Sequence, residues 1–238
     1  MCTLVLLERP GELLAISGNR NELLARASSG PRIEGGVLAP RDEVAHGSWL
    51  GLNRHGLFVC VTNRRNAMVD PARRSRGLLV MEALQARSAR GLHEALRELR
   101  GDRHNGFHLV YADLAEAFVT WGDGYAIQQL ALEPRRVHVV TERSFGAGEG
   151  AREPSVARAF ADLPPDVDAW RAPMTVHAEE PLESACVHAD AVGYGTRSSF
   201  QLVLRPAGAR ALWTEGPPCV NPPRDISDLV AQLFAAGR

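Results

Sequence analysis

Short apolar runs separated by turn residues dominate the chain and predict β-strands. The first two runs, residues 3–7 and 12–17, flank a Pro-Gly pair and predict an opening hairpin, so that Cys2 stands at the start of a strand. Further strands are expected over residues 56–63, 106–112, 116–121, 125–132, 135–141, 185–190, 200–205 and 210–216. The pattern therefore predicts a protein built mainly of antiparallel sheet.

Apolar positions at helical spacing interrupt the strands in three places. Residues 77–100 predict a helix pair broken near Gly91, residues 156–163 a short helix, and residues 225–236 a closing helix. Runs of strands with helices grouped between them are typical of an α+β fold with two antiparallel sheets packed face to face and helices outside. The glycine-rich stretch 145–150 is the best linker candidate. The segments beyond it continue the same pattern of short strands and helices, so we expect a single domain over residues 1–238.

Composition excludes two classes of partner. The net charge of −1 and the 23% charged residues give no bulk field that would attract nucleic acid or an anionic membrane, and 6% aromatic residues provide no stacking platform for single strands. Glu8, Arg9 and Pro10 interrupt the first apolar run, and no later run approaches the 18 residues of a membrane span. We therefore expect a cytoplasmic protein that neither binds nucleic acid nor inserts into a membrane.

The spacing of cysteine and histidine predicts no metal site. The four cysteines show no C-x-x-C pair, and the sequence contains no H-E-x-x-H motif. His104 and His108 are four residues apart, but they flank the start of an expected strand rather than sharing a helix face. We expect a core that needs neither a metal nor a disulfide.

Cys2 has a specific chemical use if Met1 is removed, as a small second residue generally permits. The residue then carries a thiol and a free α-amine, and an amine with a reference pKa of about 7.7–8.0 can accept the thiol proton near neutral pH. Such a nucleophile also needs polar groups beside the thiolate and hydrogen-bond donors for an oxyanion. The other interpretation is that Cys2 is simply an apolar strand residue.

A polar cluster follows the second expected strand. It consists of Asn19, Arg20, Asn21 and Glu22. The end of the second hairpin strand returns beside the start of the first, so this cluster is expected next to Cys2. A solvated turn is the alternative for these four residues.

Several segments, taken together and in order, resemble the NRDE family, also called the transport and Golgi organisation protein 2 family. The segments are MCTLVLLE, SGNRNELLARAS, GSWLGLNRHGLFVCVTN, SRGLLVMEAL, NGFHLVYADL and GYGTRSSFQLVL. The resemblance implies the four-layer αββα sandwich of N-terminal nucleophile hydrolases. It also implies a ligand-handling protein, with haem trafficking as the leading expectation and acyl-CoA-like ligands next.

The same segments more distantly resemble bile-salt hydrolases and penicillin V acylases, which cleave amides with an N-terminal cysteine. That resemblance implies Cys2 as nucleophile, Arg20 beside it, Asn63 as oxyanion donor and Arg197 as a late arginine near the nucleophile. An N-terminal cysteine amidohydrolase or thioesterase is thus the alternative function.

Two departures from those hydrolases count against their chemistry. Asn21 stands where they have the Asp that holds the cysteine amine, and an amide cannot compensate an ammonium charge. Glu142 stands where they have an Asn, which would put a carboxylate near the oxyanion.

The expected ligand site combines the polar cluster with arginines. It comprises Asn19, Arg20, Asn21, Glu22, Arg64 and Arg197. Residues 63–77 hold Arg64, Arg65, Arg73, Arg74 and Arg76, which either belong to a solvated loop or lie at the mouth of a pocket for carboxylate or phosphate groups. Haem is a possible ligand, with His46, His104 and Cys2 as candidate axial ligands.

Overall fold

The computed structural model describes residues 2–236, and within that range two antiparallel sheets of seven strands each pack face to face. The first sheet has the order β10-β1-β2-β12-β13-β14, with β11 also paired to β12. Its strands are β1 (Cys2–Arg9), β2 (Leu13–Leu23), β10 (Val137–Val140), β11 (His188–Ala189), β12 (Tyr194–Arg205), β13 (Gly208–Glu215) and β14 (Arg224–Asp225).

The second sheet runs in sequence order from β3 to β9. Its strands are β3 (Ser28–Glu34), β4 (Val37–Asp42), β5 (Leu50–Asn53), β6 (Phe58–Asn63), β7 (Phe107–Ala112), β8 (Ala117–Gly122) and β9 (Ile127–Ala131). Each strand pairs antiparallel with the next, and the connection from β6 to β7 is the long one that carries the helices of this half of the chain.

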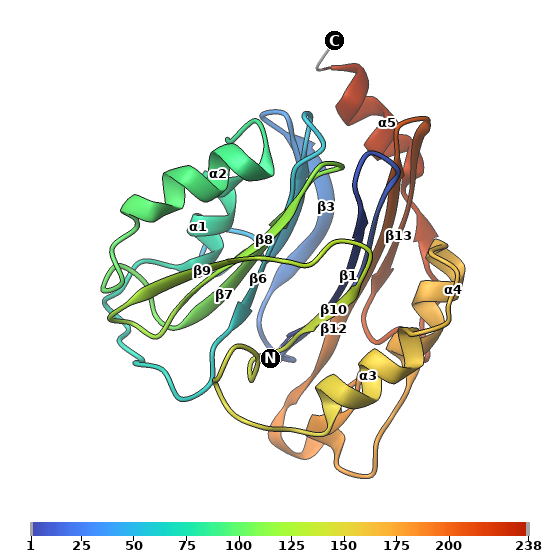
Figure 1. Ribbon diagram of the computed structural model, residues 1–238. Helices are drawn as coiled ribbons and strands as arrows, with labels where there is room; N and C mark the ends of the chain where they lie inside the picture. Colours follow the sequence, from blue (N-terminus) through green and yellow to red (C-terminus); the bar gives the residue numbers. More distant parts are fainter. Residues whose placement is uncertain (1, 237–238) are drawn as a thin grey trace.

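Helices cover the outer face of each sheet (Figure 1). Helices α1 (Arg76–Ala83) and α2 (Ala89–Ala95), with the short η1 (Leu96–Glu98), lie on the second sheet. Helices α3 (Arg152–Phe160) and α4 (Val167–Arg171) lie on the first, where the short helices η2 (Ala172–Thr175), η3 (Pro181–Glu183) and η4 (Asp190–Val192) follow them. Helix α5 (Ser227–Ala235) packs on β13, β3 and β4, at the opposite end of the molecule from the N-terminus (Figure 1). The expected four-layer αββα sandwich is confirmed.

The four layers explain why the first strand is an apolar run rather than an alternation. Leu4 and Leu6 of β1 join the core between the sheets, whereas Val5 and Leu7 pack under α3 and α4. A strand that is buried on both faces needs apolar residues at every position. Cys2 and Arg20, in register with the inward positions, consequently face the space between the sheets.

Some sequence-based boundaries were wrong. The helix pair breaks at residues 84–88 rather than near Gly91, because Ser88 starts α2 by accepting a hydrogen bond from the Gly91 amide. The strand expected over residues 185–190 is only the two-residue β11. Strands β3, β4 and β5 were not predicted.

Candidate functional site

A polar pocket of about 170 Å³ opens where Cys2 begins β1. Cys2 and Arg20 are directly paired in the β1–β2 ladder, so the hairpin places both residues side by side at the same end of these two strands. The opposite wall comes from the second sheet, where Val61 and Asn63 end β6. The site therefore depends on both sheets.

Arg20 is held firmly although it is charged and nearly fully buried. Its guanidinium carbon lies 4.2 Å from the centre of the Trp49 ring, and its Nη2 lies 4.0 Å from Glu22 and 3.9 Å from Asp42. Burial lowers the pKa of Arg20 from its usual value, although nearby negative charge opposes this shift. A fixed cation thus stands beside the position of the Cys2 thiol.

Positive charge exceeds negative charge around the pocket. Within residues 2–236 its lining includes five arginines and two carboxylates: Arg20, Arg26, Arg73, Arg74, Arg76, Glu22 and Asp42. Arg26 pairs with Asp42 at 2.8 Å, and Arg74 pairs with Glu82 outside the pocket. Arg76 instead donates to the Gly106 carbonyl, which leaves its charge available to an anion. Arg73 donates to the carbonyls of His104 and Gly124, and its Nε lies 3.8 Å from Asp70.

A close backbone contact shapes the third wall. Ser75 starts α1 and lines the pocket with Arg76 and Gly77. A Cβ on Gly47 would lie 2.3 Å from the Gly77 carbonyl carbon, so this packing of the start of α1 requires glycine at position 47. The first turn of α1 adds the positive end of a helix dipole to the arginines.

The structure brings five of the predicted site residues together and separates three from them. The pocket is lined by Cys2, Arg20, Asn21, Glu22 and Asn63. Among the described residues, Asn19, Arg64 and Arg197 are not part of its lining.

Asn19 serves the fold instead of a ligand. Its side-chain amide donates to the carbonyls of Met174 and Ala185, both at 2.8 Å, on the outer face of the first sheet. The alternation of a strand explains the difference, because Asn19 points away from the face that Arg20 occupies.

Arg64 is directed to a loop beyond the pocket. Its guanidinium donates to the carbonyls of Ser144 and Phe145 and contacts buried His108 at 2.8 Å. Burial lowers its pKa.

Arg197 is the extra residue of a β-bulge in β12, between Thr196 opposite Asn21 and Ser198 opposite Arg20. It lies on the strand that pairs with β2 but is not part of the pocket lining described for residues 2–236.

Asn21 is fixed by a neighbour that sequence reasoning missed. Thr196 donates its hydroxyl hydrogen to Asn21 Oδ1 at 2.7 Å, and Tyr194 donates to the Asn21 backbone carbonyl at 2.7 Å. No local sequence motif indicates the role of Thr196, because it is more than 170 residues away from Asn21 in the chain and reaches it only through the pairing of β12 with β2.

Glu142 is not among the described residues that line the pocket. It is buried and makes a two-pronged ion pair with Arg152, with N–O distances of 3.2 and 3.1 Å. Both residues line a separate hollow of about 440 Å³, which is formed by residues 141–146, 148–150 and 152–154 together with Glu183. The Glu142 carboxylate is therefore paired with Arg152 and lies outside the described lining of the pocket.

Two of the three candidate haem ligands lie elsewhere. His46 lines a small hollow by β4, and His104 is buried with its Nδ1 bonded to the Arg74 carbonyl. Of the three, Cys2 alone is found among the described lining residues.

Comparison with known proteins establishes the family. The model of the family Transport and Golgi organisation 2 matches residues 1–151, more than half of the chain. The chain belongs to this family. The human Transport and Golgi organization protein 2 homolog is 30% identical over 109 residues, which are 46% of this chain and 36% of the human protein. The match thus spans about a third of the length of that relative.

Solved structures support the fold of this family member independently. A Caenorhabditis elegans ortholog of N-acylethanolamine-hydrolyzing acid amidase superposes with a TM-score of 0.57 at 11% identity, covering 86% of this chain and 92% of the amidase. A variant of conjugated bile acid hydrolase from Clostridium perfringens gives 0.51 at 12% identity, covering 95% and 93%. The fold is that of the N-terminal nucleophile hydrolases.

Among residues 2–236, no helix combines the length and apolarity that crossing a membrane requires.

Proposed function

We propose that this protein is an N-terminal cysteine hydrolase that cleaves an amide or thioester of an anionic acyl compound. The proposal rests on one observation above all: Cys2 and Arg20 are paired across the first hairpin and face one pocket together with Asn63. This is the arrangement that a thiolate nucleophile, a stabilising cation and an oxyanion donor need.

In this mechanism Met1 is first removed, and the freed α-amine of Cys2 accepts the thiol proton. The thiolate attacks the acyl carbon, and the negative charge that develops on the acyl oxygen is stabilised by the Asn63 amide. The protonated amine returns its proton to the leaving amine or thiol, and water then releases the acyl group from Cys2. Arg20 provides a positive charge on the same pocket face as the Cys2 sulfur throughout.

Charge and size suggest the substrate class. The excess of arginines favours a carboxylate or phosphate on the substrate, as in an acyl-CoA-like thioester or an N-acyl amino acid. A cavity of about 170 Å³ can enclose the reacting group and an anionic head, while a long acyl chain would extend outside. Asn21 holds the amine in this scheme as a neutral acceptor rather than as a carboxylate.

Haem handling is the second candidate, and the same pocket supports it in a different way. Cysteine thiolate is a known axial ligand of haem iron, and arginines bind propionates. Cys2 and the surrounding arginines offer both, with the macrocycle lying over the pocket mouth because the cavity is too small to enclose it.

Intact mass, alkylation and turnover measured on one preparation separate the two candidates. For the hydrolase we expect a chain without Met1, faster reaction of iodoacetamide with Cys2 than with half-buried Cys219, and release of acid from acyl thioesters or N-acyl amino acids. Cys2→Ala should abolish turnover and Asn63→Ala should reduce it about 10²-fold. Cys60→Ala is the matched control, because burial raises the pKa of that thiol well above its usual value and leaves it unreactive.

Retained Met1 with no turnover, together with a haemin Soret shift that Cys2→Ala removes, would replace the hydrolase proposal with haem binding. Neither turnover nor a Soret shift would reject both candidates.

A further inference from the structure

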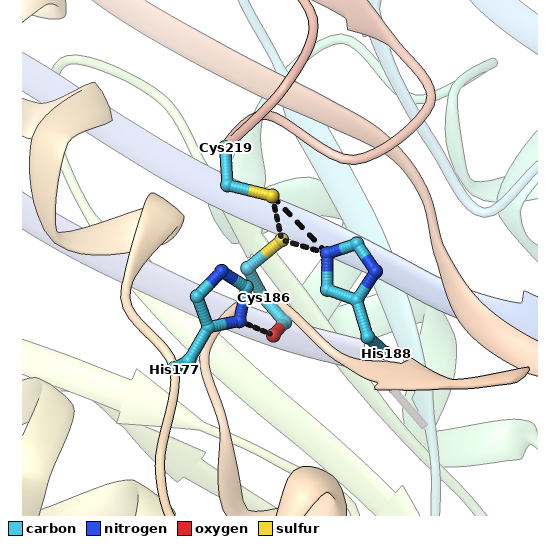
Figure 2. A group of neighbouring side chains, drawn as sticks. All are labelled: His177, Cys186, His188 and Cys219. Atoms are coloured by element: carbon cyan, nitrogen blue, oxygen red, sulfur yellow. Dashed lines mark hydrogen bonds between the residues drawn. The ribbon is translucent and has the colours of Figure 1, made fainter.

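Four metal-ligating side chains gather on the outer face of the first sheet, away from the Cys2 pocket. They are His177, Cys186, His188 and Cys219, and one ligand atom from each lies within 4.8 Å of the others (Figure 2). The sequence showed no such site because Cys186 and Cys219 are separated by 33 residues and by three strands of the sheet.

The distances match tetrahedral coordination. The two sulfurs are 3.5 Å apart, and His188 Nε2 lies 3.1 Å from Cys219 Sγ and 3.7 Å from Cys186 Sγ. Zinc bonds of about 2.3 Å to sulfur and about 2.0 Å to nitrogen, at tetrahedral angles, put ligand atoms about 3.8 Å apart for two sulfurs and about 3.6 Å for sulfur and nitrogen. An ion fits between these atoms with small side-chain adjustments.

The fourth ligand is already oriented for coordination. His177 Nδ1 lies 3.0 Å from the carbonyl oxygen of Cys186, so it is the donor of that hydrogen bond when Nε2 is left free to bind a metal. Zinc-binding histidines regularly fix their second nitrogen in this way. The rings of His177 and His188 are 5.0 Å apart between centroids, which places both beside the two sulfurs (Figure 2).

The backbone around the cluster is held in place by further contacts. His188 belongs to β11, which pairs with β12, and the Cys186 amide donates to the Val176 carbonyl. The loop of Cys219 is held by Arg171, which donates to the carbonyls of Pro218 and Asn221 at 2.6 and 2.9 Å. The four ligands are therefore positioned by the fold before any ion binds, which reduces the entropy lost on binding.

We propose that His177, Cys186, His188 and Cys219 form a structural zinc site that fastens residues 177–188 to the loop after β13. Two thiols release their protons on binding, so the complex of Zn²⁺ with two thiolates and two neutral imidazoles carries no net charge. That neutrality suits a half-buried position. Four protein ligands leave no open position for a reacting water, so the role is structural.

A disulfide between Cys186 and Cys219 is the competing use of the two sulfurs. Both cysteines are free in the structure, and a disulfide would give no reason for two imidazoles to converge on the same point. The tetrahedral set of two sulfurs and two nitrogens favours zinc over octahedral or oxygen-preferring ions.

The site also bears on the Cys2 pocket. The Val187 amide, between two of the ligands, donates to Thr196 Oγ1, and Thr196 in turn donates to Asn21. Zinc would thus support the strand behind Asn21 without contacting a substrate.

The test begins with the purified full chain and zinc itself. We expect one equivalent of zinc per chain by elemental analysis, and zinc should protect Cys186 and Cys219 from alkylation. Replacement by Co²⁺ should give the visible bands of tetrahedral cobalt with thiolate-to-cobalt charge transfer. These measurements on the unmutated chain need no variant to fold.

Variants then locate the ion. Cys219→Ser and His177→Ala should weaken zinc binding at least 10-fold, measured by competition with a chromophoric chelator. His55→Ala, which removes an exposed histidine on a distant turn, should bind zinc like the unmutated chain. Cys2→Ala should also keep its zinc while losing any hydrolysis, which separates failure of this proposal from failure of the proposed function.

Metal-free protein with a mass 2 Da lower and Cys186 linked to Cys219 would overturn the proposal in favour of a disulfide. Zinc that binds Cys219→Ser and His177→Ala as tightly as the unmutated chain, or cobalt spectra without thiolate charge transfer, would overturn it as well.

Discussion

At the scale of single residues, the pocket shows how one strand serves two purposes. Arg20 and Glu22 face the pocket, whereas Asn19 turns to the opposite side of the sheet and binds the carbonyls of residues 174 and 185. Sequence reasoning located the polar cluster beside Cys2 but assigned all four residues to a ligand. Successive side chains of a strand point to opposite faces of the sheet, so Asn19 and Arg20 cannot face the same pocket. The sequence alone did not show which of the two faces points toward the pocket.

His108 provides a titration that can be measured separately from the pocket. It is fully buried on β7 between Thr62, Arg64 and the Ser144 carbonyl, and burial together with Arg64 lowers its pKa to about 4. In the unfolded chain a histidine has a pKa of about 6.5. As the pH falls, His108 therefore binds a proton in the unfolded chain before it does so in the folded protein, which favours unfolding. The stability from neutral His108 is complete above pH 6.5 and is lost toward pH 4.

We expect this loss to reach about 3 kcal/mol and to disappear in His108→Gln. Urea unfolding of both proteins between pH 7 and pH 4.5 measures it, and the stability of the unmutated chain should fall relative to the variant. Glu8 acts in the opposite direction, since burial raises its pKa to about 7 and its contribution is lost as the pH rises. Glu8 is present in both proteins and cancels in the difference. Parallel pH curves for the two proteins would contradict the expectation.

At the scale of elements, the sequence predicted the longer apolar strands but missed the three successive strands β3, β4 and β5, although β5 is fully buried. Strands β1 and β6 are apolar runs and were predicted with small errors at their ends. Strand β2 was predicted to end at residue 17, but it continues through the polar cluster to Leu23. Strand β3 is half-exposed, contains Gly30 and Pro31, and pairs irregularly with β4 between Ser29 and Arg32. Such an edge strand has neither an alternation nor an apolar run to reveal it.

The site was predictable to the extent that it lies within one hairpin. Cys2 and the polar cluster lie side by side because β1 and β2 pair as a hairpin, and the Pro-Gly turn between these strands predicts that hairpin from the sequence. Asn63 ends β6 of the other sheet, and its proximity was suggested by the resemblance to the hydrolases. The arginines of residues 73–76 follow β6, and their place at the pocket mouth was suggested by the arginine-rich run itself. Thr196 and the zinc ligands meet through long-range pairing that no single sequence displays.

Asn19 anchors the segment that crosses the outer face of the first sheet. Asn19→Ala would leave two buried carbonyl oxygens without their donor, so we expect a loss of about 2 kcal/mol in the free energy of unfolding. Hydrogen exchange should also become faster over residues 174–188. Gln128→Ala, an exposed strand amide in the second sheet, should change stability by less than about 0.5 kcal/mol. Unchanged stability together with weakened ligand binding would instead restore the sequence-based assignment of Asn19 to a ligand site.

At the scale of the whole molecule, the pocket exists only while the two sheets remain packed. Cys2 comes from the first sheet and Asn63 from the second, and the core between the sheets sets their relative position. Phe58 of β6 and Phe200 of β12 stack across this core with ring centroids 6.2 Å apart and parallel planes. Because the two sheets share this core, we expect them to unfold together in one cooperative transition.

Native-state hydrogen exchange in low urea tests this cooperativity. The slowest amides of β2 and β7, one strand from each sheet, should open with the same free energy. Phe58→Ala removes a fully buried ring and should lower both values by about 4 kcal/mol, even though the substitution lies in the second sheet alone. Leu130→Ala is the control, because that side chain is exposed at the sheet edge and its loss should leave both values nearly unchanged. If Phe58→Ala weakened β7 while β2 kept its full protection, the two sheets would be separate folding units, and a reaction that needs Cys2 and Asn63 together would then require them to dock before each turnover.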